Sequence, residues 1–196
     1  MNAQPDSHVA TRHPLRFVRH GATAANLAGL RCGGDLDLPL TEQGREQAQA
    51  AAAQIARLDP AVGLIVTSDL QRTRETARII ASRLRGVPVV VEPAFGERLL
   101  GQWNLQSIAA TQPLLEARQT PPGGESEDEF MARIEGALRR IAPCLARRPL
   151  LVGSKGVARV LGELSGRSGR LELANGVVET FDGARLMSLQ AMGSAA

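Results

Sequence analysis

The chain has 196 residues, of which 43% are hydrophobic and 22% are charged, and its formal net charge is +3 at pH 7. This length and composition fit one globular domain with a sizeable buried core. The 23 lysines and arginines are scattered, and there is no tyrosine to stack on bases, so a nucleic-acid-binding surface is not expected. The mildly basic balance is compatible with an anionic substrate.

Targeting signals and membrane segments are not expected either. No apolar run approaches the roughly 18–20 residues that span a bilayer. The first residues lack the hydrophobic segment of a secretory signal, and we interpret 1–14 as a flexible lead-in. Cys32 and Cys144 lie far apart and form no CxxC pair, which favours free thiols and a cytoplasmic location.

Short apolar runs alternate with longer helical patterns along the chain. Strands are expected at 15–18, 63–68, 87–92 and 150–153, with late strands at 177–183 and 185–191. Helices are expected at 41–58 and 68–84. A third helix is expected to start in the acidic end of the loop 120–130 and to continue through 148. Thr41 is placed to cap the first of these helices, and the spacing of Ser68 and Gln71 predicts a capping box at the second.

This alternation predicts an α/β fold, a three-layer α/β/α sandwich with a mostly parallel central sheet. We expect one domain over 15–190, with a short lid around 101–125. In such sheets, ligands bind where strands end and helices begin. The turns that follow the predicted strands are therefore the places to look for chemistry.

The first of these turns carries the sequence RHGATAAN over residues 19–26. His20 follows a strand directly, with Arg19 beside it and Asn26 in the helix that follows. A single histidine is more often a packed or solvated residue than a catalytic one. An arginine and a histidine together at a strand-to-helix turn instead place a possible nucleophile beside a fixed cation and a helix N-terminus.

The later turns add further charged residues. Arg72, Arg74 and Arg78 share one helix, where arginines usually form a solvated face, but Arg72 lies one turn after a strand and could grip two phosphate oxygens. Glu97 follows the third strand, where it is either an exposed loop residue or a proton donor. Lys155 follows the fourth strand in the turn GSKG.

Together these turns predict a site for a phosphoryl group. Cations and a histidine suit its negative charge, and a carboxylate could assist a leaving oxygen. The sequence contains no P-loop, GxGxxG or HExxH motif and no acidic metal cluster, so we expect no metal and no cofactor.

Five segments resemble the histidine phosphatase superfamily, also called phosphoglycerate mutase-like, and they occur in the family's order over roughly residues 15 to 160. They are FVRHGATAAN, DLPLTEQGREQA, LIVTSDLQRTRETA, ERLLGQWN and PPGGESEDEFMAR. The resemblance implies a phosphoglycerate mutase-like fold and a phosphohistidine mechanism.

The family mechanism maps onto matching positions of this chain. His20 would attack phosphorus, Arg19 and Arg72 would hold the phosphoryl oxygens, and Asn26 would shape the pocket. Glu97 would protonate the leaving alcohol and then assist water. The implied partner is a small phosphorylated substrate or free phosphate. The resemblance leaves the oligomeric state open, with a dimer among the options.

Lys155 departs from the family pattern, because a second histidine is expected at this position. A lysine keeps a positive donor for phosphate but is a flexible point charge. Three alternatives follow: a working phosphomonoesterase, a weak or inactive member that binds a phosphorylated ligand, and a phosphoglycerate mutase-type enzyme. The short segment between Glu97 and the PPGGES loop leaves little room for the large lid of the mutases, which disfavours the third.

The substrate is only outlined by the sequence. The stretch CGGDLDLPLTEQG is similar to the α-ribazole phosphatases of cobalamin synthesis and also to small broad-specificity members of the family. Five apolar residues could line a specificity lid, with core packing as the alternative for most of them: Trp103, Leu105, Ile108, Leu114 and Leu115.

Overall fold

The computed structural model describes residues 14–167, 171–183 and 185–186. The lead-in predicted over 1–14 lies outside this part of the chain, except for Pro14. Within the described ranges, no helix combines the length and the apolar character that crossing a membrane requires.

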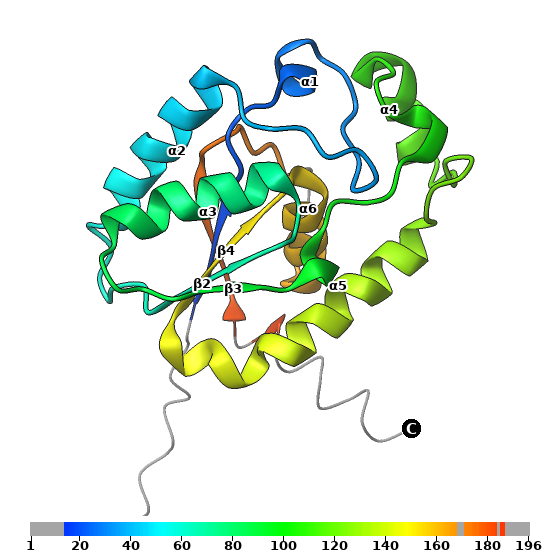
Figure 1. Ribbon diagram of the computed structural model, residues 1–196. Coiled ribbons are helices and arrows are strands. Elements are labelled where there is room, and N and C mark those ends of the chain that lie inside the picture. Colours follow the sequence, from blue (N-terminus) through cyan, green and yellow to red (C-terminus); the bar gives the residue numbers. More distant parts are fainter. Residues whose placement is uncertain (1–13, 168–170, 184, 187–196) are drawn as a thin grey trace, which may run out of the picture.

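One five-stranded sheet occupies the centre of the molecule, in the order β3-β2-β4-β1-β5 (Figure 1). Its strands are β1 (Leu15–Arg19), β2 (Leu64–Thr67), β3 (Val89–Val91), β4 (Pro149–Gly153) and β5 (Val178–Phe181). The pairs β1–β4, β4–β2 and β2–β3 are parallel, and β5 lies antiparallel against β1 at one edge. The predicted α/β fold with a mostly parallel sheet is therefore confirmed.

Helices cover both faces of this sheet. They are α1 (Ala24–Leu27), α2 (Glu42–Ile55), α3 (Gln71–Arg83), α4 (Ile108–Glu116), α5 (Glu127–Ile141) and α6 (Lys155–Leu164). Three short 3₁₀ helices join them: η1 (Pro93–Phe95), η2 (Gly101–Trp103) and η3 (Ala142–Arg147). Figure 1 shows α2 and α3 together on one side, with α5 and α6 elsewhere around the sheet.

Two apolar cores arise because neighbouring strand residues point to opposite faces of the sheet. Phe17 packs with residues of α5 and α6, such as Phe130 and Val157. Val18, the next residue of the same strand, packs instead with residues of α2 and α3, such as Ile55 and Ile80. This alternation produces the three layers that the sequence predicted.

The first residues of α2 and α3 show that local sequence predicts one helix cap correctly and the other wrongly. Thr41 caps α2 as predicted, accepting a hydrogen bond from the Gly44 amide at 3.1 Å. The predicted cap at Ser68 is wrong, since α3 begins at Gln71 and its first amide donates to Asp37 Oδ1 at 2.7 Å. The Ser68 hydroxyl bonds to Thr73 Oγ1 instead.

Two other predicted elements need correction. The helix expected to run to 148 starts in the acidic stretch as predicted, at Glu127 after the Ser126 cap, but it gives way to η3 at Ala142. The strand expected at 185–191 is not seen: residues 185 and 186 are helical, and 187–191 lie outside the described residues.

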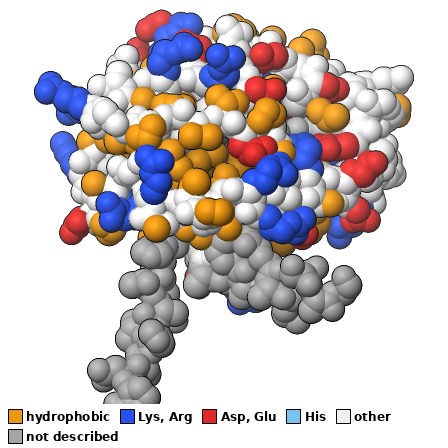
Figure 2. Space-filling model, turned by 60° about the horizontal axis from the view of Figure 1, so that its bottom comes forward, with side chains coloured by type: hydrophobic (Ala, Val, Ile, Leu, Met, Phe, Trp, Pro, Cys, Tyr) orange, Lys and Arg blue, Asp and Glu red, His pale blue; other side chains and the backbone are white. Residues whose placement is uncertain are grey.

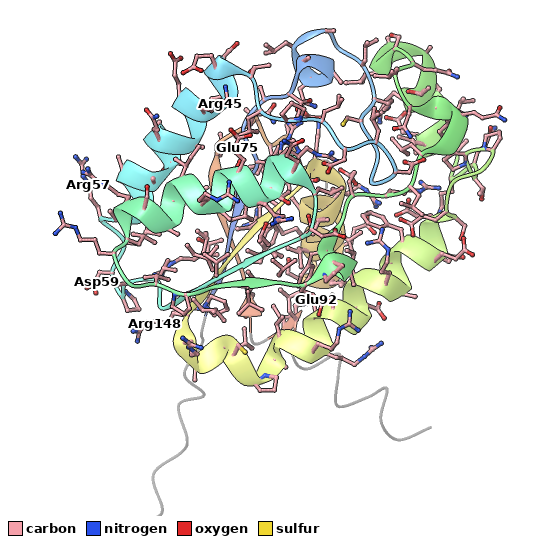
Figure 3. The ribbon with its side chains drawn as sticks, viewed as in Figure 1. Arg45, Arg57, Asp59, Glu75, Glu92 and Arg148 are labelled. Atoms are coloured by element: carbon pink, nitrogen blue, oxygen red, sulfur yellow. The ribbon has the colours of Figure 1, made fainter. Side chains whose placement is uncertain are left out.

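Ion pairs link neighbouring elements at the surface, and Figure 3 labels Arg45, Glu75 and Glu92 among their members. Arg45 on α2 pairs with Glu75 on α3 at 2.7 Å, and Glu92 after β3 pairs with Arg140 on α5 at 2.9 Å. The edge strand β3 is less covered, with its three valines 42–46% exposed. Figure 2 shows apolar side chains gathered between charged ones on the face to which this edge contributes.

Candidate functional site

A cavity of about 710 Å³ opens where the parallel strands end. Its wall includes residues from the turn after β1, from α4, from the first turns of α6 and from the segment 171–175. Figure 1 shows α1 and α4 beyond the end of β1, on the side away from the amino ends of the strands. This is the edge of the sheet at which an α/β fold binds its ligands.

His20 forms part of the cavity wall and is only 3% exposed. Its Nδ1 atom lies 2.7 Å from the carbonyl oxygen of Gly21. Because a carbonyl only accepts hydrogen bonds, Nδ1 carries the proton and Nε2 keeps its lone pair. Burial, followed by the charges of Arg72 and Arg19, holds the pKa of His20 well below its usual range. The ring is therefore neutral at pH 7.

Arg19 ends β1 and points its guanidinium toward the C-terminal part of the domain. Nη1 donates to the carbonyl oxygen of Leu173 at 2.6 Å. Burial lowers the pKa of Arg19, and the negative charges of Glu97 and Glu172 oppose that shift. Arg19 is thus a cation placed between two carboxylates and His20.

Arg72 is completely buried beside the cavity. Its Nη1 donates to the Leu36 carbonyl at 2.8 Å and its Nη2 to the Gly33 carbonyl at 3.0 Å. The guanidinium is fixed by backbone from the loop that precedes α2, and it is the largest charge effect on the pKa of His20. A rigid buried arginine of this kind is suited to a bidentate anion.

Three buried donors share one property within the described ranges. Arg19 Nε, Arg72 Nε and the Ser154 hydroxyl have no hydrogen-bond partner. Arg19 ends β1, and Arg72 and Ser154 follow the ends of β2 and β4, so the three donors come from neighbouring strands of the sheet. Because buried polar groups are nearly always hydrogen-bonded, three unpartnered donors at one sheet edge are typical of a binding site rather than of a core.

Glu97 is anchored on the opposite side by two backbone amides. Its Oε1 accepts from the Arg98 amide at 2.8 Å, and its Oε2 accepts from the Gly156 amide at 2.9 Å. Gly156 fits this contact because it lacks a side chain: a Cβ atom there would lie 2.0 Å from Glu97 Oε1. The start of α6 therefore positions the carboxylate.

Two asparagines brace the turn that carries His20. Asn26 closes a capping box with Thr23 at α1, and its Oδ1 accepts from the Thr23 amide at 3.1 Å. Asn175 donates from Nδ2 to the His20 carbonyl at 2.8 Å and reaches Asn26 Oδ1 at 3.4 Å. The backbone on both sides of His20 is thus tied to a segment more than 150 residues away.

Lys155 begins α6 and lines the cavity, as its place after β4 predicted. Its Nζ donates to Glu172 Oε2 at 2.8 Å. Glu172 lies in the 171–175 segment, which also supplies the Leu173 carbonyl to Arg19. The ammonium group is therefore paired with a carboxylate at the rim of the cavity.

The structure thus gathers five of the six predicted site residues around one cavity, with Arg72 enclosed beside it. Of the suggested lid residues, Ile108 and Leu115 line the cavity, whereas Trp103 is buried and Leu105 is exposed. Among the described side chains, no three His, Cys, Asp or Glu residues come together in a group that could hold a metal ion.

Sequence reasoning missed four residues of the site: Ser154, Gly156, Glu172 and Asn175. Ser154 and Gly156 flank Lys155 in the turn after β4, and a glycine there is a signal of close backbone approach. The Asn175-Gly176 dipeptide is a strong turn signal that could have marked its segment. Glu172 carried no such signal.

Comparisons with known proteins agree with this geometry. Residues 15–169 match the family model described as histidine phosphatase superfamily (branch 1). A protein named as a probable phosphoglycerate mutase from Photorhabdus laumondii is 36% identical over 81% of this chain and 80% of its own length.

Solved structures with the same fold include two phosphatases. A mycobacterial glucosyl-3-phosphoglycerate phosphatase in complex with VO₃ has a TM-score of 0.73 and 29% identity, covering 87% of this chain and 90% of that one. The alpha-ribazole phosphatase from Shigella flexneri has a TM-score of 0.68 and 25% identity, covering 85% and 89% of the two chains.

Proposed function

Since the chain belongs to branch 1 of the histidine phosphatase superfamily, we propose that it is a phosphomonoesterase that acts on a small phosphorylated metabolite through a phosphohistidine at His20. The observation that carries this proposal is a neutral, buried histidine whose pKa is lowered by burial and then by the charges of two arginines, beside three unpartnered donors. Phosphatases among the structural relatives support the same reaction class.

In the first step, His20 Nε2 attacks phosphorus while the bond from phosphorus to the alcohol oxygen breaks. The carbonyl of Gly21 keeps the proton on Nδ1, so the attacking nitrogen presents its lone pair. Glu97 gives its proton to the departing alcohol oxygen. Two backbone amides hold that carboxyl group in place, so little reorganisation is needed during transfer.

In the second step, water attacks phosphorus and the phosphorus–nitrogen bond breaks. The Glu97 carboxylate takes a proton from the water. Phosphate is released, and His20 returns to its neutral form. Arg19, Arg72 and Ser154 donate to the phosphoryl oxygens in both steps, and Lys155 adds a donor from the rim. The protein contributes mainly position and positive charge. Asn26 keeps its predicted role in shaping the pocket, and 101–125 serves as the lid.

A second candidate is a weak or inactive family member that binds a phosphorylated ligand. The ion pair of Lys155 with Glu172 favours it, because a lysine held by a carboxylate is a poorer phosphate ligand than a free donor. The mutase alternative is suggested by relatives with that name, and the short lid segment weighs against it.

Phosphate release from a panel of small phosphomonoesters tests the proposal. We expect turnover by the wild type and a fall on the order of 10⁴-fold or more in His20→Ala, since the nucleophile is lost. His13→Ala, a second histidine in the same chain, is the matched control and should keep full activity.

Equal activity in His20→Ala would contradict the phosphohistidine mechanism. No release from any ester by the wild type, together with a rise in melting temperature when phosphate is added, would establish the binding candidate instead.

A further inference from the structure

We propose that the alcohol half of the substrate is uncharged and largely apolar, and that Glu172 enforces this preference by neutralising Lys155. The inference rests on the proposed phosphomonoesterase function and names the substrate class for the same cavity. It follows from two properties of the cavity wall beyond His20, which are its apolar surface and the pairing of its charges.

The first property is the apolar surface. A phosphoryl group fills only a small part of a cavity of about 710 Å³, so the remainder surrounds the alcohol. Six apolar side chains from five different parts of the chain contribute to that wall: Leu30, Leu100, Ile108, Leu115, Phe130 and Leu171. An apolar alcohol gains about 25 cal/mol for each Å² of apolar surface that it buries there.

The second property is that the wall's arginines are already engaged by protein groups. Arg98 donates to Glu127 at 2.9 Å and also to the carbonyls of Glu125 and Gln119. Arg159, one turn after Lys155 on α6, donates to both Glu127 and Glu163. These cations are neutralised before a substrate arrives.

The two arginines of the lid side also have protein partners, although these are neutral or exposed groups. Arg118 pairs with Asp128 at 3.3 Å. Arg31 donates from Nε to Thr111 at 2.7 Å and from Nη2 to Gln112 at 2.8 Å. A carboxylate or second phosphate on the alcohol would lose its hydration here and would have to displace an existing partner, which costs free energy.

Lys155 is a cation of this wall that is held by one exposed ion pair. It has one carboxylate partner, Glu172, and both side chains are well exposed, at 39% and 63%. Exposed ion pairs of this kind are weak. Removal of the Glu172 charge would therefore leave an unneutralised positive group at the rim of the cavity, without disturbing the buried arginine pairs.

The test compares two esters of equal shape, 4-carbamoylbenzyl phosphate and 4-carboxybenzyl phosphate, which differ by one negative charge. We expect the wild type to have the higher kcat/KM with the neutral amide. In Glu172→Gln the preference should fall about three- to tenfold, as expected for one rim charge. Because both esters share the phosphoryl group, the ratio is insensitive to changes in phosphate binding.

Two variants control this result. Glu46→Gln removes one exposed negative charge from α2, outside the cavity wall, and should leave the ratio unchanged. Lys155→Met added to Glu172→Gln should restore the wild-type preference, since the released cation is then gone.

The outcomes separate the inference from the proposed function. Cleavage of both esters with a wild-type preference for the carboxylate would overturn the inference and leave the phosphomonoesterase intact. An unchanged ratio in Glu172→Gln would overturn the role of Glu172. No cleavage of any phosphomonoester would instead contradict the proposed function itself.

Discussion

The floor of the cavity and its rim hold their charged groups by different means. On the floor, Arg72 and His20 are almost fully enclosed, and backbone carbonyls fix both side chains. At the rim, Lys155 and Glu172 hold each other while much of each side chain remains in water. Burial gives the floor a fixed geometry and a shifted histidine pKa, whereas solvent screens the rim pair.

Under the proposed function, this difference separates reaction chemistry at the floor from substrate choice at the rim. A change on the floor alters packing, hydrogen bonding and the pKa of the nucleophile together. A change at the rim alters one weak interaction, so the rim is where a family member can change its substrate at little cost in stability. The following predictions test this division, beginning with the largest effect.

The floor should be intolerant of change at Arg72. Arg72→Met leaves the carbonyls of Gly33 and Leu36 without their donor and removes a charge near His20. We expect a loss of about 3 kcal/mol in the free energy of unfolding, and loss of activity. Urea unfolding measures the first. Arg74→Met, an exposed arginine on the same helix, should change stability by less than about 0.5 kcal/mol.

Equal stability losses in the two arginine variants would contradict this prediction, because the burial of Arg72 would then contribute nothing to the free energy of unfolding.

The position of Glu97 can be tested through its glycine contact. In Gly156→Ala the new Cβ would lie 2.0 Å from Glu97 Oε1, so the carboxylate must move. A shift of about 1 Å costs on the order of 100-fold in kcat. The flexible glutamate can give way, so the fold should persist. Steady-state kinetics with a thermal melt measures both effects.

Gly162→Ala on the same helix is the matched control, since its Cβ would only touch Phe181 at 3.9 Å. It should keep full activity and gain about 0.5–1 kcal/mol in stability from helix propensity. Full activity in Gly156→Ala would show that the anchoring of Glu97 is not needed.

The smallest effect concerns pH. The pKa of His20 in the folded protein lies well below its usual value of 6.5. As the pH falls below about 6.5, the unfolded chain binds this proton before the folded protein does, so the free energy of unfolding decreases. The slope is up to about 1.4 kcal/mol per pH unit until the folded-state pKa is reached. Unfolding curves of His20→Gln should lack this component, and identical pH slopes would argue against a buried neutral histidine.

The sequence predicted His20 on the floor and Lys155 at the rim because strand, turn and residue type coincide at both positions. His20 and Lys155 directly follow or nearly follow apolar strands, so their place at the sheet edge could be read from the pattern. The partners of Arg72 could not, because the carbonyls that bind it belong to an irregular loop some 40 residues earlier. Ser68 failed as a cap for the same kind of reason, since Asp37 of that loop takes the role.

The acidic residue of the rim was harder to predict from the sequence. Glu172 lies beyond the segments that resemble the family, and no turn or periodic pattern marks it. Asn175 was equally hidden, although the glycine that follows it signals a turn. Both residues reach the site because β5, which follows them in the chain, pairs with β1 and so lies beside the strand that carries Arg19.

That pairing has a consequence for how the protein is made. His20 is synthesised some 155 residues before the Asn175 amide that braces its backbone, and Arg19 about as long before the Leu173 carbonyl that holds it. At about 5–20 residues per second, the nascent chain carries its histidine for many seconds before the brace exists. The brace on His20 therefore forms only after β5 has been synthesised and has paired with β1.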